Sequence, residues 1–255
     1  MPLNAGVHTA SSRRAAFGPV LSIQIYARIA GALLVVSMLA GIFGELYVPA
    51  KMIEFSDAAA TAKNITSHGE LFRLGFAGYL VEALCDIALT LLFYVLLRPV
   101  HRQIALLMAL FGVIATATYA MAEFFYAAAP VVLGDDSLLK VFSVGQRDAV
   151  ALLMLKLYGY GGEIFMAFYG SAIVIRGYLV IRSTFLPRIL GVLMVIAGAG
   201  FIVKNFAMLL MPSYASDLLL LPMFVSAVVL ALWLLIKGVN VSRWHATMVA
   251  ASAGE

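Results

Sequence analysis

Long apolar stretches, separated by short polar connections, set the pattern of this chain. A run of about 20 apolar residues is long enough for a helix to cross the hydrocarbon core of a bilayer. Windows of that kind predict six membrane-spanning helices, at residues 28–48, 73–97, 102–128, 150–181, 187–211 and 217–237. We therefore expect an all-α integral membrane protein built as a bundle of six transmembrane helices.

Prolines support several of these boundaries. Pro99, Pro130 and Pro212 come just after the second, third and fifth spans, where they can end a helix. Pro187 suits the first turn of the fifth span, because the N–H that proline lacks is not needed there. The fourth span is too long for one straight crossing, so we expect its first residues to lie at the membrane interface.

Basic residues gather on one side of the predicted bundle. The N-terminal tail, the turns after spans two and four and the C-terminal tail carry ten of them: Arg13, Arg14, Arg28, Arg98, Arg102, Arg176, Arg182, Arg188, Lys237 and Arg243. The opposite connections hold most of the acids outside the spans: Glu54, Asp57, Glu70, Asp135, Asp136, Asp148 and Asp217. Short basic connections stay on the cytoplasmic side of a membrane. The pattern predicts cytoplasmic tails at residues 1–25 and 239–255, on either side of a transmembrane domain at residues 26–238 in the plasma membrane.

The connections on the acidic side are long enough to hold short helices. Asp57 can cap the N-terminus of the alanine-rich segment that follows it. Residues 135–148 mix apolar and polar side chains, so we expect this segment to lie along the outer membrane surface.

The composition excludes an ordinary soluble domain. Hydrophobic residues make up 64% of the chain and charged residues 12%, whereas soluble domains have about 25% charged residues. The net charge of +4 is explained by the basic cytoplasmic side, so we predict the lipid bilayer and no nucleic acid as a partner. The single cysteine, Cys85, excludes a disulfide within the chain.

Two acids one helical turn apart, Glu82 and Asp86, interrupt the second span. A carboxylate in the middle of a bilayer costs at least ~2.5 kcal/mol, so such residues indicate a functional site by default. Asp86 lies 13 residues from Arg73 and 12 from Arg98, which places it near the midplane. The other charges of the spans fall between the midplane and the outer surface: Glu45, Glu123, Lys156, Glu163 and Lys204. We expect all seven charges to meet in one outward-facing space.

Helical spacing adds tyrosines to the same faces. Tyr79 shares a stripe with Glu82 and Asp86, Tyr119 shares one with Glu123, and Tyr160 lies between Lys156 and Glu163. In membranes, stripes of polar and small residues turn toward neighbouring helices. The candidate ligand-binding residues are therefore Glu45, Tyr79, Glu82, Asp86, Tyr119, Glu123, Lys156, Tyr160, Glu163 and Lys204.

Three glycines in four residues, Gly159, Gly161 and Gly162, precede Glu163. Glycine allows a backbone or a ligand to approach closely, and small residues equally allow close helix packing. Both interpretations remain open at this point.

Three kinds of function fit the predicted cluster of charges. The leading hypothesis is an acidic, outward-facing pocket that binds or transports a small polar or cationic ligand, coupled to protons if Glu82 and Asp86 share one. The second is an intramembrane enzyme that uses the paired carboxylates on a lipid or quinone-like substrate. The third is a structural or partner subunit in which the charges pair internally.

No cofactor or metal site is predicted. All four histidines, His8, His68, His101 and His245, fall outside the spans. A membrane haem normally takes axial histidines from within helices, and a zinc hydrolase needs a histidine cluster. We therefore expect neither haem nor a metal ion.

Six sequence blocks, in a fixed order, resemble a known family. They are ARIAG (27–31), AAATAKNI (58–65), ELFRLG (70–75), LCDIALTLLFYVLLRPV (84–100), YGYGGEIF (158–165) and LPRILGVLMVIAGAGF (186–201). Together they resemble the bacterial multi-pass membrane family catalogued as domain of unknown function 4386, from about residue 27 to residue 236. The resemblance implies a small integral protein of the bacterial plasma membrane, and it brings no established activity.

Overall fold

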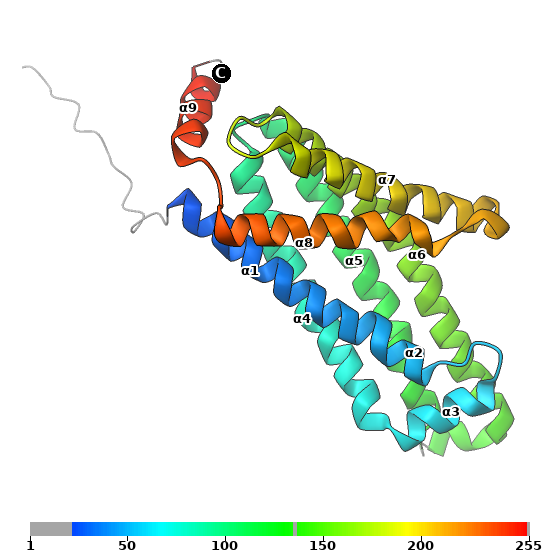
Figure 1. Cartoon of the computed structure of the whole chain (residues 1–255). Helices are drawn as coiled ribbons and strands as arrows, with labels where there is room; N and C mark the ends of the chain where they lie inside the picture. The colour runs from blue at the N-terminus through cyan, green and yellow to red at the C-terminus, as the bar shows by residue number, and fades with distance from the viewer. Residues whose placement is uncertain (1–21, 135–136, 254–255) are drawn as a thin grey trace, which may run out of the picture.

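The computed structural model describes residues 22–134 and 137–253, and these residues form helices and no strand (Figure 1). Six helical segments are long and apolar enough to cross a membrane, which confirms the predicted number. The first combines α1 (Ile23–Gly41), a π-helix η1 (Ile42–Tyr47) and α2 (Val48–Met52). The others are α4 (Gly69–Leu97), α5 (Arg102–Val132), α6 (Val144–Arg182), α7 (Arg188–Leu210), and η4 (Asp217–Leu220) continued by α8 (Leu221–Ile236).

One predicted boundary is wrong. Pro130 lies inside α5, which continues to Val132 instead of ending before the proline. Pro130 gives up the hydrogen bond from its own N–H to residue 126, and its ring crowds that carbonyl; because only two residues of α5 follow, the disruption is confined to the last turn.

Short helices connect the spans. Asp57 caps α3 (Ala58–Ser67) as predicted, because its carboxylate accepts a hydrogen bond from the backbone N–H of Ala60 at 2.9 Å. The 3-10 helices η2 (Ser137–Val141) and η3 (Pro212–Tyr214) precede the fourth and sixth segments. Ser143 and Gln146 form a capping box at the start of α6.

The end of the chain also folds onto the bundle. Residues 241–252 form α9 (Val241–Ser252), and the indole N–H of Trp244 donates a hydrogen bond to the carbonyl oxygen of Leu96 at 2.9 Å. The predicted N-terminal tail, with Arg13, Arg14 and His8, lies almost entirely outside the described residues, as do Asp135, Asp136 and Glu255. We call the end of the bundle that carries α9 the α9 end, and the opposite end, which carries α3, the α3 end.

Glycines hold the helices together at close range. On α6 and α7, Gly170 faces Gly198 and Gly177 faces Gly191, and a Cβ atom at any of the four would collide with a backbone carbonyl of the neighbouring helix. Gly31 likewise lets α8 approach α1 near the α9 end. Such contacts between small residues are the usual basis of helix association in membranes.

The buried apolar residues form two clusters at different levels of the bundle. The larger, which includes Phe93, Leu97 and Leu190, lies toward the α9 end, and the smaller, which includes Phe72 and Tyr126, lies toward the α3 end. On α4 the two acids fall between Phe72 and Phe93. The polar residues of the spans therefore occupy a layer between two apolar cores.

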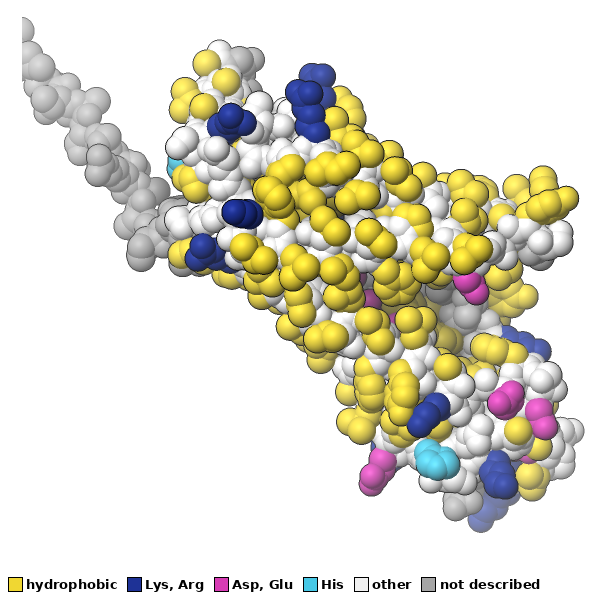
Figure 2. All heavy atoms as spheres, in the orientation of Figure 1, with side chains coloured by type: hydrophobic (Ala, Val, Ile, Leu, Met, Phe, Trp, Pro, Cys, Tyr) yellow, Lys and Arg dark blue, Asp and Glu magenta, His cyan; other side chains and the backbone are white. Residues whose placement is uncertain are grey.

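The helices separate toward the α3 end. Near α9 the first and last spans are in contact, but α8 and α1 diverge along their length (Figure 1). A hollow remains between them, and acidic side chains are visible inside it (Figure 2). Large apolar side chains cover the outside of the spans (Figure 2). Leu84, Leu91 and Ile189 are among the exposed ones. So much exposed apolar surface is stable only in lipid, and the protein is therefore embedded in a membrane.

Candidate functional site

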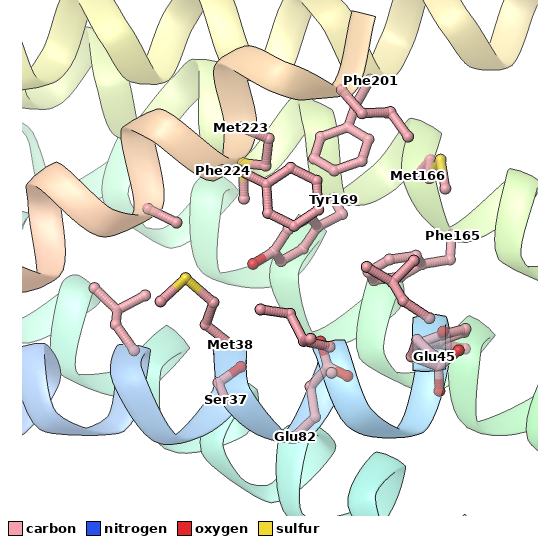
Figure 3. Close-up of a pocket in the computed structure, with 17 residues that line it drawn as sticks. Ser37, Met38, Glu45, Glu82, Phe165, Met166, Tyr169, Phe201, Met223 and Phe224 are labelled. Atoms are coloured by element: carbon pink, nitrogen blue, oxygen red, sulfur yellow. The ribbon is translucent and has the colours of Figure 1, made fainter. Parts of the chain in front are cut away.

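The hollow between α1 and α8 contains a cavity of about 210 Å³, which we call the lateral pocket. Every spanning segment contributes to its wall, and the residues marked in Figure 3 are Ser37, Met38, Glu45, Glu82, Phe165, Met166, Tyr169, Phe201, Met223 and Phe224. Most of these side chains are apolar or aromatic. The two carboxylates, Glu45 and Glu82, lie on the side formed by α1 and α4 (Figure 3).

Glu82 reaches the pocket from α4 across the backbone of α1. It has room there because residue 41 is a glycine: a Cβ atom at Gly41 would lie 2.7 Å from both carboxylate oxygens of Glu82. One of these oxygens, Oε2, is buried and has no hydrogen-bond partner in the described part of the chain. Glu82 is thus an acid at the pocket wall with one oxygen whose hydrogen-bonding capacity is not used by the described part of the chain.

Asp86 lies one turn closer to the α9 end and is satisfied by the protein. Its Oδ1 accepts a hydrogen bond from the hydroxyl of Ser37 at 3.0 Å. It also interacts electrostatically with Arg176, and Tyr169 lies within reach of both charges. Asp86 therefore has a counter-charge, which Glu82 lacks.

The position of Arg176 corrects the sequence interpretation, which placed it in the cytoplasmic turn after the fourth span. It is buried inside α6, and its guanidinium lies 4.2 Å from the centre of the Phe93 ring. The statement that the seven expected charges were the only ones inside the spans is consequently wrong. Long helices can carry a basic residue well before their end when an acid on a neighbouring helix compensates the charge.

Glu45 belongs to the π-helix η1, which interrupts the first span. Its carboxylate accepts a hydrogen bond from the hydroxyl of Tyr158, and Tyr119 and the carboxyl group of Glu123 lie within hydrogen-bonding range of it. A direct contact between two carboxyl groups is favourable only when at least one of them holds a proton. Single π-turns in helices are frequent at functional sites.

Glu123 belongs to α5 and Tyr79 to α4, and both lie where these two helices face each other. Each is only 2% exposed, and neither Glu123 Oε1 nor the Tyr79 hydroxyl has a hydrogen-bond partner in the described residues. The ring of Tyr79 meets that of Tyr119 edge to face, with centroids 5.1 Å apart.

A second charged group lies apart from the lateral pocket. The ammonium group of Lys204 on α7 lies 3.2 Å from Glu163 on α6 and 3.5 Å from Asp217 on η4. None of these residues lines the lateral pocket. The group connects α6, α7 and η4 and fits an internally paired, structural role.

Two of the predicted site residues lie away from both groups. Tyr160 is 69% exposed, and Lys156 is also exposed on the surface of α6. The glycines near these two residues serve helix packing, because Gly161 allows α6 to contact Ala122 of α5. The close-packing interpretation of that glycine cluster therefore holds at Gly161.

Several residues of the site were missed by the sequence analysis: Ser37, Tyr158, Tyr169 and Arg176. Ser37 precedes Gly41 by four residues, so it shared a helical face with a residue that makes room for an acid. Tyr158 stands in the same YGYGG segment from which Tyr160 was chosen. For Tyr169 the sequence carried no comparable signal.

Comparison with known proteins places the chain in a family. The family model described as Domain of unknown function (DUF4386) matches residues 29–238. The chain belongs to this family. An uncharacterized protein of Archaeoglobus fulgidus resembles this DUF4386 protein with 28% identity over 166 residues, which are 65% of this chain and 85% of the relative. No solved structure matches. The resemblance seen in the sequence blocks is confirmed, and the DUF4386 chain is a multi-pass membrane protein.

Proposed function

We propose that the protein binds a small amphiphilic organic cation in the lateral pocket. The observation that carries this proposal is the Glu82 carboxylate, which has an unpartnered buried oxygen at the wall of an otherwise mainly apolar cavity. The sequence suggested a small polar or cationic ligand. The proposal here is more specific, because it keeps only the cation and adds that the walls of its site are mainly apolar.

Charge favours a cation at Glu82. A buried carboxylate without a counter-ion costs several kcal/mol, on the order of the desolvation penalty of a single ion. Arg176 compensates Asp86, and Lys204 compensates Glu163 and Asp217. Glu82 has no such positive partner in the part of the chain that the structure describes. A ligand cation would supply it.

The opposite wall suits the apolar part of such a ligand. Phe165, Tyr169 and Phe201 offer aromatic faces, and methionines at positions 38, 166 and 223 offer flexible, polarizable surface. Aromatic faces attract organic cations by about 0.5–2 kcal/mol each, and methionine adapts to ligands of different shape. The cavity volume of about 210 Å³ is below the range of about 300–1,000 Å³ for drug-sized ligands, which indicates a smaller molecule.

The direction of the opening supports an amphiphile. The pocket opens sideways between α1 and α8, toward the lipid-facing surface (Figure 2). A ligand that partitions into the membrane can reach it without passing through the bundle. A strongly hydrated ion would have to leave its water before reaching the opening.

The proposal is tested with benzyltrimethylammonium, a cation that cannot lose its charge. We expect it to bind the protein in lipid nanodiscs, measured by equilibrium dialysis of the radiolabelled ion, and Glu82→Gln to weaken binding at least tenfold. Because a carboxyl group without a counter-charge in a membrane holds a proton, the cation must displace that proton. Affinity should therefore rise with pH in the parent protein and be independent of pH in Glu82→Gln.

The matched control is Glu70→Gln, the same substitution at an exposed acid of α4 that does not line the pocket. It should bind as the parent does. Equal binding of neopentylbenzene, the uncharged isostere, or unchanged cation binding by Glu82→Gln would overturn the proposal.

A further inference from the structure

A second cavity lies in a groove between α4 and α5, and it shares no lining residue with the lateral pocket. We call it the α4–α5 groove; its volume is about 350 Å³. Its wall is apolar over most of its area, with Leu84, Ile87 and Phe124 among the lining side chains. Leu84 and Phe124 are largely exposed on the outside of the bundle, so the groove faces lipid.

Three polar residues line this groove: Tyr79, Thr116 and Glu123. The hydroxyl of Thr116 is occupied, since it donates to the carbonyl oxygen of Gly112 at 3.1 Å. The Tyr79 hydroxyl and Glu123 Oε1 are buried without a partner in the described chain. An unsatisfied buried polar group costs about 1–3 kcal/mol, so two among the residues that line one groove favour a partner outside the chain.

The contacts of Glu45 bear on whether Glu123 acts as a hydrogen-bond donor or acceptor. Glu45 already accepts a hydrogen bond from Tyr158, which suits an ionised carboxylate. In the arrangement proposed below, Glu123 holds the proton of this pair and donates it to Glu45. The free oxygen of Glu123 is accordingly a neutral acceptor, while the free Tyr79 hydroxyl is a donor.

We propose that the α4–α5 groove binds a neutral amphiphile whose polar end is a hydroxyl group. One hydroxyl satisfies both partners, because it accepts a hydrogen bond from Tyr79 and donates one to Glu123. Its apolar body would lie along the groove wall in place of bulk lipid. The inference does not rest on the proposed function, since it concerns a different cavity and a ligand without charge.

Depth restricts the class of amphiphile further. Glu123 precedes Val132, the last residue of α5, by nine residues, or roughly 13 Å of helix. A group at that depth lies below the head groups of a bilayer whose hydrocarbon core is about 30 Å thick. A phospholipid keeps its head group at the surface, whereas a long-chain alcohol can place its hydroxyl at this level.

The test uses hexadecanol with a photoreactive diazirine in the middle of its chain. After irradiation of the protein in nanodiscs, labelled peptides are quantified by mass spectrometry. We expect labelling on α4 and α5 that falls about tenfold in Tyr79→Phe, which removes only the donor. Glu123→Gln should retain labelling, because its amide can donate to Glu45 while its oxygen still accepts.

Three controls make the outcome decisive. Tyr178→Phe, the same substitution at an exposed tyrosine of α6, should label like the parent. Ala120→Trp, which fills the groove, should abolish labelling there. The corresponding diazirine alkane, which lacks the hydroxyl, should label weakly, and Tyr79→Phe should not change its labelling.

Two outcomes would overturn the proposal: equal labelling by alkane and alcohol, or alcohol labelling unaffected by Tyr79→Phe. Either would leave water as the partner of both groups. Displacement of the alcohol by benzyltrimethylammonium would overturn the neutral assignment.

Discussion

At the scale of single residues, the site depends on a glycine as much as on an acid. Glu82 lies over Gly41, and the space for its carboxylate is the space that any larger residue at position 41 would fill. The position of the Glu82 carboxylate therefore depends on α1, although Glu82 itself belongs to α4. A substitution on α1 should change the chemistry of α4.

We predict that Gly41→Ala lowers the affinity for benzyltrimethylammonium at least tenfold. The added methyl group would lie 2.7 Å from the Glu82 carboxylate oxygens and force them to move; overpacking of this kind typically costs about 1–3 kcal/mol. Equilibrium dialysis of the variant in nanodiscs measures the change.

Gly159→Ala is the matched control for this substitution. A Cβ atom at Gly159 meets nothing within 4 Å, and alanine in a helix interior is favoured over glycine by up to about 1 kcal/mol. Binding should stay at the parental level in this variant. An equal loss in both variants would show that Gly41 has no special relation to Glu82.

At the scale of elements, the group around Lys204 joins α6, α7 and η4. Its members differ in exposure: the side chains are 7% exposed for Lys204, 22% for Glu163 and 90% for Asp217. Two ion pairs of nearly the same length should therefore differ in energy, because water screens the exposed pair.

We predict that Lys204→Met lowers the free energy of unfolding by about 1–3 kcal/mol, because the partly buried Glu163 loses its partner. Asp217→Asn should cost less than about 1 kcal/mol, as exposed ion pairs do. Unfolding by sodium dodecyl sulfate in mixed micelles measures both. Lys156→Met removes an exposed lysine of α6 and serves as the control; a cost equal to that of Lys204→Met would contradict the assignment.

The elements also show how far sequence reasoning reaches. The six spans follow from apolar windows of bilayer length, and Asp57 was recognisable as a cap, because both depend on local pattern. The pairing of charges depends on which helices are neighbours. Lys156 and Lys204 looked equivalent in sequence, yet within residues 22–134 and 137–253 an ion pair forms at Lys204 and not at Lys156, since α7 turns Lys204 toward α6.

Two errors have a more specific physical origin. Arg176 was counted with the cytoplasmic turn because a basic residue near a helix end normally reaches water, but Phe93 and Asp86 hold it inside. The contact of Glu45 with Glu123 and Tyr158 could not be predicted from a period of 3.6 residues, because the π-helix changes the period at that point.

At the scale of the whole molecule, the bundle has a closed end and an open end. Close contacts join α1 to α8 near α9, while the lateral pocket lies where the same helices diverge toward α3 (Figure 1). If the basic α9 end faces the cytoplasm, the pocket lies in the outer half of the membrane. That orientation is still a prediction from the distribution of basic residues.

Labelling of single cysteines tests it. In a Cys85→Ala background, we predict that His68→Cys reacts with a membrane-impermeant maleimide in intact cells, because α3 faces outward. Lys237→Cys should react only after the cells are permeabilised. Both positions are exposed in the structure, so a lack of reaction cannot be due to burial, and the reverse pattern would invert the orientation.

The π-helix has a consequence for how sequences in this family can be aligned. It accommodates one residue more than an α-helix would between Gly41 and Val48. Deleting that residue would restore regular α-helical hydrogen bonding and leave the flanking stretches facing as they do now, because the wide turn absorbs the extra residue. Val48 and Met52 would then keep their places in the apolar core at the α3 end, whereas the wide turn that carries Glu45 would be lost. A relative with a one-residue gap in this interval should therefore keep the core and differ in how it presents the residue at the position of Glu45.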